Sequence, residues 1–138
     1  MRRSLGLKMA KYCTDTVIID NNKVYTSYFS RAGRIVPNRR LLSISRGTPE
    51  NWGGAYLREL NPSGSLLGSF KAGYVTQAEY EITYRYETLS KLNPIDIYNK
   101  TRGKVLCCWE KSGEFCHRHI VLKWLREELG DEIIGGEI

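Results

Sequence analysis

The sequence predicts one α/β domain, in which a small and mostly parallel sheet is flanked by helices. Its 138 residues are enough for one domain with one sizeable core. Short runs rich in β-branched, aromatic or apolar residues predict strands at 24–29, 41–45 and 104–109. Helical patterns follow these runs, and such a succession is typical of a parallel sheet covered by helices.

The first third of the chain contains two predicted strands separated by a basic loop. Residues 1–12 are basic and poorly patterned, and we expect a loose arm there before a single domain over 13–138. The basic run over 31–40 is interrupted by Gly33 and Pro37, which predicts a loop between the strands.

The middle of the chain is predicted to be irregular and then helical. Residues 46–75 are rich in glycine, and only a short helix near 55–60 is expected there. Thr76 and Glu79 form a capping-box pattern, which predicts a helix continuing to about residue 90. The apolar residues expected on its buried face are Ala78, Ile82, Tyr86 and Leu89.

The last third contains the strand expected at the centre of the sheet. The run over 104–109 is short and apolar, which is typical of a strand buried on both faces. A short helix is expected from Pro94, because proline is favoured at the first helical position. A longer helix is expected over 115–129 and ends at Gly130. Together these elements favour a Rossmann-like three-layer fold.

The net charge of +6 is concentrated near the N-terminus. Residues 1–46 hold ten lysines and arginines against two aspartates, whereas the rest of the chain is nearly neutral. A local basic stretch suggests a site for phosphate, nucleotide or nucleic acid. The alternative is a solvated basic loop without a specific partner.

Composition also predicts the cellular setting. No apolar run approaches the ~18 residues that a membrane helix needs, and the N-terminus lacks the apolar core of a signal peptide. The four cysteines, at positions 13, 107, 108 and 116, are too few and too unevenly spaced for a disulfide framework. We therefore expect free cysteines in a cytoplasmic protein that has no membrane partner.

The segment most informative about chemistry follows the predicted strand that ends at Trp109. Ligands of open α/β sheets bind beyond the carboxyl ends of strands, and the first turn of a helix attracts anions. Cys116, His117 and Arg118 fall in that turn, where Arg118 could hold a phosphate through two parallel hydrogen bonds. Cys116 could have thiolate character, and His117 and Glu110 could act as acid–base groups.

The same residues have structural interpretations. Cys107 and Cys108 point to opposite faces of their strand, so both cannot line one site, and packing is the simpler role. His117 could bond to the backbone. Arg118 begins a helix, where a cation is disfavoured unless an anion offsets it. We therefore expect Arg118 to have a specific partner, which is either a ligand or an internal carboxylate.

Zinc-ligand residue types occur in this segment, namely Cys107 or Cys108 with Cys116, His117 and His119. The spacing lacks the paired C-x2-C knuckles of common zinc sites, so we predict no metal or cofactor and keep structural zinc as an alternative. The cysteine–arginine spacing also excludes a tyrosine-phosphatase loop. No phosphate-binding glycine motif is present.

The residues at 106–119 form the pattern Leu-Cys-Cys-Trp-Glu-Lys…Phe-Cys-His-Arg-His. Residues that accompany it earlier in the chain are Thr26–Phe29, Ser43–Arg46, Pro49, Trp52, Tyr56 and Leu60–Pro62. From about Val24 to Leu129 the chain therefore resembles the domain-of-unknown-function 488 family. The resemblance implies a compact α/β cytoplasmic protein of bacterial or phage type, but it implies no activity. It supports treating five residues as one unit: Cys107, Glu110, Cys116, His117 and Arg118.

A second group of residues is expected near the same site. Arg46 follows the second predicted strand. If that strand is the parallel neighbour of the one at 104–109, Arg46 and Arg118 converge on one pocket rim. Tyr28, Arg31 and Trp52 could then form a stacking wall for a nucleotide or a flipped base. Packing of the two aromatic residues in the core is the alternative.

The predicted function is that of a nucleotide- or nucleic-acid-directed protein with an anion pocket where a strand ends and a helix begins. Its ligand-binding candidates are Arg46, Arg118, Tyr28, Arg31 and Trp52, and its catalytic candidates are Glu110, Cys116 and His117. The residues leave open whether the chain is an enzyme, although hydrolysis or transfer at a phosphate- or sugar-bearing substrate fits best. The alternative is a non-catalytic module that binds a protein partner or structural zinc.

Overall fold

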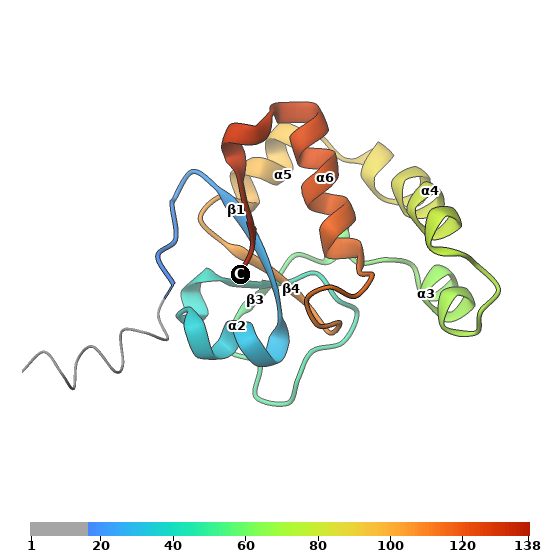
Figure 1. The fold of residues 1–138 in the computed structure, drawn as a ribbon, viewed down its shortest axis with the longest axis horizontal. Coiled ribbons are helices and arrows are strands. Elements are labelled where there is room, and N and C mark those ends of the chain that lie inside the picture. The colour runs from blue at the N-terminus through green and yellow to red at the C-terminus, as the bar shows by residue number, and fades with distance from the viewer. Residues whose placement is uncertain (1–16) are drawn as a thin grey trace, which may run out of the picture.

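The fold is built on one sheet of five parallel strands (Figure 1). The computed structural model describes residues 17–138, so the arm predicted over 1–12 lies outside it. The strands are β1 (Val24–Tyr28), β2 (Leu41–Ser43), β3 (Ala55–Tyr56), β4 (Val105–Cys108) and β5 (Ile134–Glu137). Their order is β3-β2-β4-β1-β5, and every pairing is parallel. The predicted α/β class and the parallel sheet are confirmed.

Helices cover both faces of this sheet (Figure 1). The α-helices are α2 (Phe29–Ile35), α3 (Gly64–Lys71), α4 (Gln77–Glu87), α5 (Pro94–Thr101) and α6 (His117–Leu129). Helix α2 packs on β1 and β4 from one side, whereas α6 packs on β1, β4 and β5 and also contacts α4 and α5. The three-layer arrangement expected from the sequence is therefore present. Within residues 17–138, no helix combines the length and the apolar character needed to cross a membrane.

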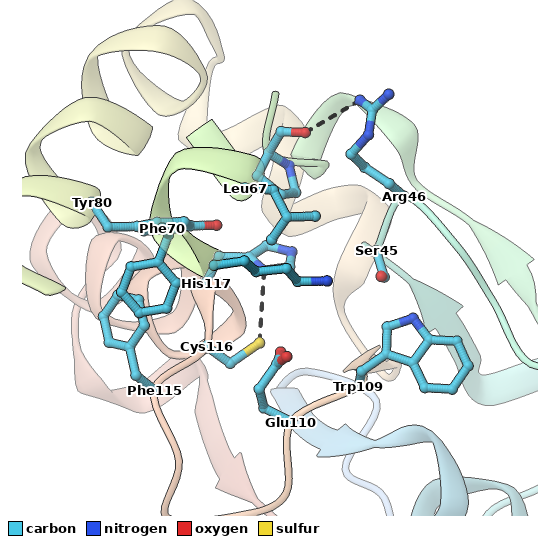
Figure 2. A pocket seen from close by; sticks show the side chains of 12 residues that line it. Ser45, Arg46, Leu67, Phe70, Tyr80, Trp109, Glu110, Phe115, Cys116 and His117 are labelled. Atoms are coloured by element: carbon cyan, nitrogen blue, oxygen red, sulfur yellow. Dashed lines mark hydrogen bonds between the residues drawn. The ribbon is translucent and has the colours of Figure 1, made fainter. Parts of the chain in front are cut away.

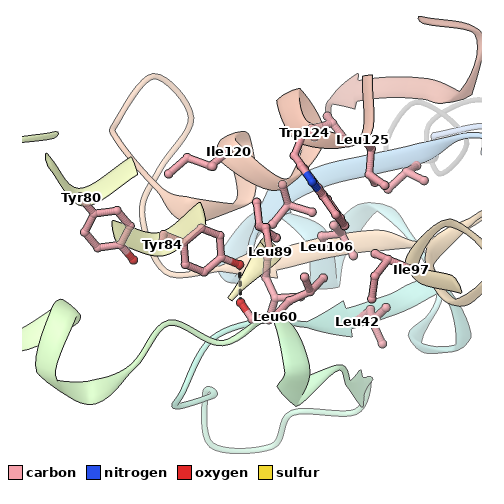
Figure 3. Close-up of a cluster of buried hydrophobic side chains, with 14 of the residues drawn as sticks. Leu42, Leu60, Tyr80, Tyr84, Leu89, Ile97, Leu106, Ile120, Trp124 and Leu125 are labelled. Atoms are coloured by element: carbon pink, nitrogen blue, oxygen red, sulfur yellow. Dashed lines mark hydrogen bonds between the residues drawn. The ribbon is translucent and has the colours of Figure 1, made fainter. Parts of the chain in front are cut away.

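The alternation of side chains along β4 divides the core between the two faces. Val105 and Cys107 belong to the cluster under α2, whereas Leu106 belongs to the larger cluster under α4, α5 and α6 (Figure 3). Because neighbouring strand residues face opposite sides, Cys108 lies on the α6 face with Leu106. The expectation that Cys107 and Cys108 face apart is confirmed.

The basic run at 31–40 is not simply a loop, since α2 occupies its first half. The buried residues of α2 are Phe29, Ala32 and Ile35, which are spaced three apart and form one narrow apolar face against the sheet. The basic residues and Gly33 between them conceal this short helical pattern in the sequence.

The helix starts predicted from capping residues are confirmed. The hydroxyl of Thr76 accepts the backbone N–H of Glu79, and the Glu79 carboxylate accepts the N–H of Thr76. At α5, Pro94 is the first residue and the amide oxygen of Asn93 accepts the N–H of Ile95 at 2.8 Å. These local hydrogen bonds satisfy N–H groups that the helix itself leaves unpaired.

The predicted buried face of α4 is wrong for three of its four residues, since only Leu89 is buried and it lies just beyond the helix. Ile82 and Tyr86 are 68% and 76% exposed, whereas Tyr80 and Tyr84 are buried. The hydroxyl of Tyr84 donates to the carbonyl oxygen of Leu60 at 2.6 Å, as Figure 3 shows. Tyrosine can therefore face the core here, because its polar end has a partner.

Strand β5 was not predicted, because its sequence Ile-Gly-Gly-Glu contains only one residue that favours strands. The strand forms by pairing with β1. A Cβ atom placed on Gly135 would lie 2.4 Å from the ring of Tyr25, so the close approach requires glycine.

The helix expected near 55–60 is also absent, since this stretch forms β3 and a short 3₁₀ turn over Arg58–Leu60.

Candidate functional site

A pocket of about 100 Å³ lies beyond the carboxyl ends of β2 and β4, beside α3, α4 and the start of α6 (Figure 2). This edge of a parallel α/β sheet is where ligands commonly bind. Twelve residues line the pocket: Ser45, Arg46, Pro62, Leu67, Phe70, Lys71, Tyr80, Trp109, Glu110, Phe115, Cys116 and His117.

Arg46 and Glu110 reach this pocket because β2 and β4 are parallel neighbours. Ser43 is paired with Cys107, so the segments that follow the two strands leave the sheet side by side. Arg46 is exposed and donates from Nη1 to the carbonyl oxygen of Pro62 at 3.4 Å, whereas Glu110 is half-buried. The structure thus brings together two of the residues that the sequence predicted for one site.

Aromatic rings form one wall of the pocket. The rings of Phe70, Tyr80 and Phe115 pack against one another with centroids 5.1 to 5.2 Å apart. Burial, and then the charge of Glu110, raises the pKa of Tyr80, so its hydroxyl stays neutral and can donate a hydrogen bond. The pocket therefore offers an apolar aromatic wall next to polar groups.

His117 is held in one tautomer at the floor of the pocket. Its Nε2 lies 2.7 Å from the carbonyl oxygen of Ile44, which can only accept, so Nε2 carries the hydrogen. Burial lowers the pKa of His117 to about 4, and the ring is neutral at pH 7. Nδ1 therefore presents its lone pair to Cys116 Sγ at 3.6 Å, as the dashed line in Figure 2 shows.

Cys108 and Cys116 are joined by a disulfide, so the expectation of free cysteines is wrong for this pair. Cys108 ends β4 on the α6 face. Cys116 is the N-cap of α6 rather than a residue of its first turn. The end of the strand and the start of the helix bring the two sulfurs together across eight residues of sequence. In this form Cys116 has no thiol with which to act as a nucleophile.

Cys107 is free and buried on the other face. Burial raises its pKa to about 12, so the group remains a thiol. It therefore lies apart from the other residues that the family resemblance grouped with it.

Arg118 has an internal partner, and its predicted role in ligand binding is withdrawn. Its side chain is fully buried, and Nε and Nη2 donate to the two carboxylate oxygens of Glu137 at 3.1 and 2.7 Å. Nη1 donates to the carbonyl oxygen of Glu110 at 2.7 Å and contacts Cys108 Sγ at 3.1 Å. The guanidinium is thus paired with Glu137 of β5 and does not line the pocket with Arg46.

Glu137 is the site residue that sequence reasoning missed. Partial burial alone would raise the pKa of Glu137. Hydrogen bonds from Arg118, Ser112 and Thr26 outweigh this effect and lower the pKa to about 2. The only signal that could have indicated this residue was a cation at a helix start, which needs a carboxylate close by.

The predicted stacking wall does not line this pocket. Tyr28 ends β1, and Arg31 lies in α2 on the opposite face of the sheet. Trp52 packs edge-on against Phe29 at 5.0 Å, and its ring N–H donates to the carbonyl oxygen of Ala55. The structural alternative is therefore correct for Trp52, and Trp109 is the tryptophan that lines the pocket.

No protein-family model, curated protein or solved structure matches this chain. The resemblance to the domain-of-unknown-function 488 family therefore remains a prediction. The functional interpretation rests on the geometry of the site itself.

Two kinds of chemistry are available at this edge of the sheet. Arg46 places a positive charge, and Glu110 a carboxyl group, beside the aromatic wall of the pocket. Below them, Cys108, Cys116 and His117 place three ligand atoms within 4.8 Å of one another, and all three residues are buried. Thiolate sulfur and imidazole nitrogen are zinc-ligand types.

Proposed function

We propose that this chain binds a small phosphate-bearing ligand of the nucleotide class in the pocket at the carboxyl ends of β2 and β4. The observation that carries the proposal is the guanidinium of Arg46 at an aromatic pocket. Within residues 17–138 this guanidinium contacts a backbone carbonyl and no carboxylate. A cation left without an anion beside a cavity is suited to bind an anionic ligand.

The composition of the pocket supports a nucleotide over a bare anion. Lys71 contributes a second cation from α3, and the rings of Phe70 and Trp109 offer surfaces for a base. A volume of about 100 Å³ is small beside the roughly 300–1,000 Å³ of pockets for drug-sized ligands. The pocket would therefore enclose only one part of the ligand. The remainder of the ligand would lie on the exposed surface next to Arg46.

Glu110 is the carboxylate of this pocket that could serve as the acid–base group of a hydrolysis or transfer reaction. His117 supports the floor in this proposal rather than exchanging protons, because its Nε2 bonds to Ile44. The proposal keeps the cytoplasmic location inferred from the sequence, where a cellular thiol pool would hold Cys108 and Cys116 reduced.

Calorimetric titration of the folded chain with AMP, ADP, ATP and inorganic phosphate tests the proposal. We expect at least one nucleotide to bind. Arg46→Ala should weaken binding by roughly 10- to 100-fold, since a hydrogen bond to a charged group contributes about 1.5–3 kcal/mol. Arg39→Ala is the matched control, because Arg39 is exposed in the 3₁₀ turn Asn38–Arg40 and does not line the pocket.

Two results would overturn the assignment. The first is that none of these probes binds, or that Arg46→Ala binds like the parent. The second is that a short single-stranded oligonucleotide binds with a steep salt dependence and loses equal affinity in Arg39→Ala and Arg46→Ala. That result would indicate general attraction to a basic surface instead of a pocket.

A further inference from the structure

We propose that the reduced chain binds one zinc ion through Cys108, Cys116 and His117, with a fourth coordination position open to the pocket. Their three ligand atoms lie within 4.8 Å of one another, and the residues come from the end of β4 and the start of α6. In this structure the disulfide joins the two sulfurs, and after reduction the end of β4 and the start of α6 would keep them near each other and near His117. This proposal does not depend on nucleotide binding, because it concerns the floor of the pocket and not Arg46.

His117 is oriented as a zinc ligand needs to be. Metal-binding histidines commonly donate their second ring N–H to a carbonyl or a carboxylate, which fixes the tautomer and aims the other nitrogen at the metal. Here Nε2 is 2.7 Å from the carbonyl oxygen of Ile44, and Nδ1 faces Cys116 Sγ. The nitrogen with the free lone pair is therefore the one directed at the sulfur atoms.

The charges around the three residues also suit a divalent ion. Two thiolates balance the two positive charges of zinc, and the neutral imidazole adds none. Arg118 lies next to the cluster, but its charge is already offset by Glu137 at 2.7 Å. Its Nη1 can donate to Cys108 Sγ, which lies 3.1 Å away. A buried site needs such compensation, because isolated buried charge is costly.

The donor types favour zinc and an open site. Sulfur and imidazole ligands select zinc over magnesium or calcium, which prefer oxygen. Three protein ligands leave one tetrahedral position, and zinc sites of that kind hold water or substrate there. Cys116, His117 and Glu110 all line the pocket, so a fourth ligand would reach the zinc ion from the pocket (Figure 2).

Zinc and the disulfide exclude each other, because both use the same two sulfurs. Reduction breaks the Cys108–Cys116 bond and takes up two electrons and two protons. Two molecules of a thiol supply both as they form their own disulfide, whereas a phosphine supplies the electrons as it becomes a phosphine oxide, and water supplies the protons and the oxide oxygen. Each thiol then loses its proton when its sulfur binds the zinc ion. The metal-bound state is therefore confined to reducing conditions.

Zinc binding by the full chain tests this inference, with the metal alone as the probe. After phosphine reduction, we expect the protein to hold one zinc per chain against a weak chromophoric chelator, and to hold none when oxidised. Cys116→Ala should abolish this binding, whereas Cys107→Ala should retain it. Cys107 is the matched control, since it is buried in the same segment but on the opposite face.

A second measurement needs no variant that could fail to fold. Bound zinc should protect Cys116 of the reduced parent chain from alkylation, as read by peptide mass spectrometry, and a strong chelator should remove the protection. The inference is wrong if reduced parent protein holds no stoichiometric zinc, or if zinc leaves the alkylation of Cys116 unchanged. A nucleotide result of either sign does not affect this outcome.

Discussion

Replacing Glu137 with glutamine tests the buried ion pair that organises one side of the site. The substitution keeps the shape of the side chain and removes the negative charge that faces Arg118. Because Arg118 is fully buried, it would be left without a compensating anion. We expect Glu137→Gln to lower the free energy of unfolding at pH 7.

The magnitude follows from the pKa of Glu137, which is lowered from 4.5 to about 2. At 1.36 kcal/mol per pKa unit, this difference corresponds to about 3 kcal/mol. The Glu137 side chain is 24% exposed, and solvent screening reduces the effect to about 2 kcal/mol. A carboxylate with a lowered pKa stabilises the fold above its unfolded pKa, and this contribution is lost as pH falls from about 4.5 towards 2.

Urea unfolding at several pH values between 7 and 2 measures both effects. The stability difference between the parent and Glu137→Gln should be about 2 kcal/mol at pH 7 and should shrink across the acid window. Glu128→Gln, an exposed position on α6, is the control and should change stability by less than about 0.5 kcal/mol. A variant as stable as the parent at pH 7, or a difference that does not vary with pH, would refute the reasoning.

Two further substitutions test the packing around α4. Tyr84→Phe should destabilise the fold by about 1–3 kcal/mol in urea unfolding, because the buried carbonyl of Leu60 loses its hydrogen-bond donor. Tyr86→Phe, on the exposed side of the helix, is the control and should leave the stability unchanged. Thr76→Ala should lower the free energy of unfolding by about 1 kcal/mol, since the N–H of Glu79 loses its hydrogen-bond acceptor. Amide hydrogen exchange in the first turn of α4 should then become faster, and equal exchange in both proteins would contradict this role of the cap.

Local patterns were sufficient to predict three of the five strands and the helices α4, α5 and α6, but not β3, β5, α2 or α3. The strands β1, β2 and β4 have strong apolar or β-branched runs, and the starts of α4 and α5 have side chains that cap them. The position of the pocket also followed from the sequence, because parallel neighbours end at the same edge. Arg46 and Glu110 both line the pocket there, whereas the expected convergence of Arg46 with Arg118 does not occur.

The features that were missed depend on contacts between distant residues. Glu137 lies 19 residues beyond Arg118, in a strand whose glycines hide it, so the partner of the arginine could not be identified. The meeting of Cys108 with Cys116 depends on how the first turn of α6 sits over β4. The choice of Tyr84 instead of Ile82 for the core depends on the carbonyl of Leu60.

The position of β1 between β4 and β5 has a consequence for synthesis of the protein. When β1 leaves the ribosome, neither of the strands that will flank it has been translated, because both belong to the last third of the chain. The pairing of β1 with β4 can therefore form only late in synthesis, and pairings between strands far apart in the sequence form slowly. Until then the nascent chain exposes the edges of β1, so a chaperone acting during translation has a defined segment to shield.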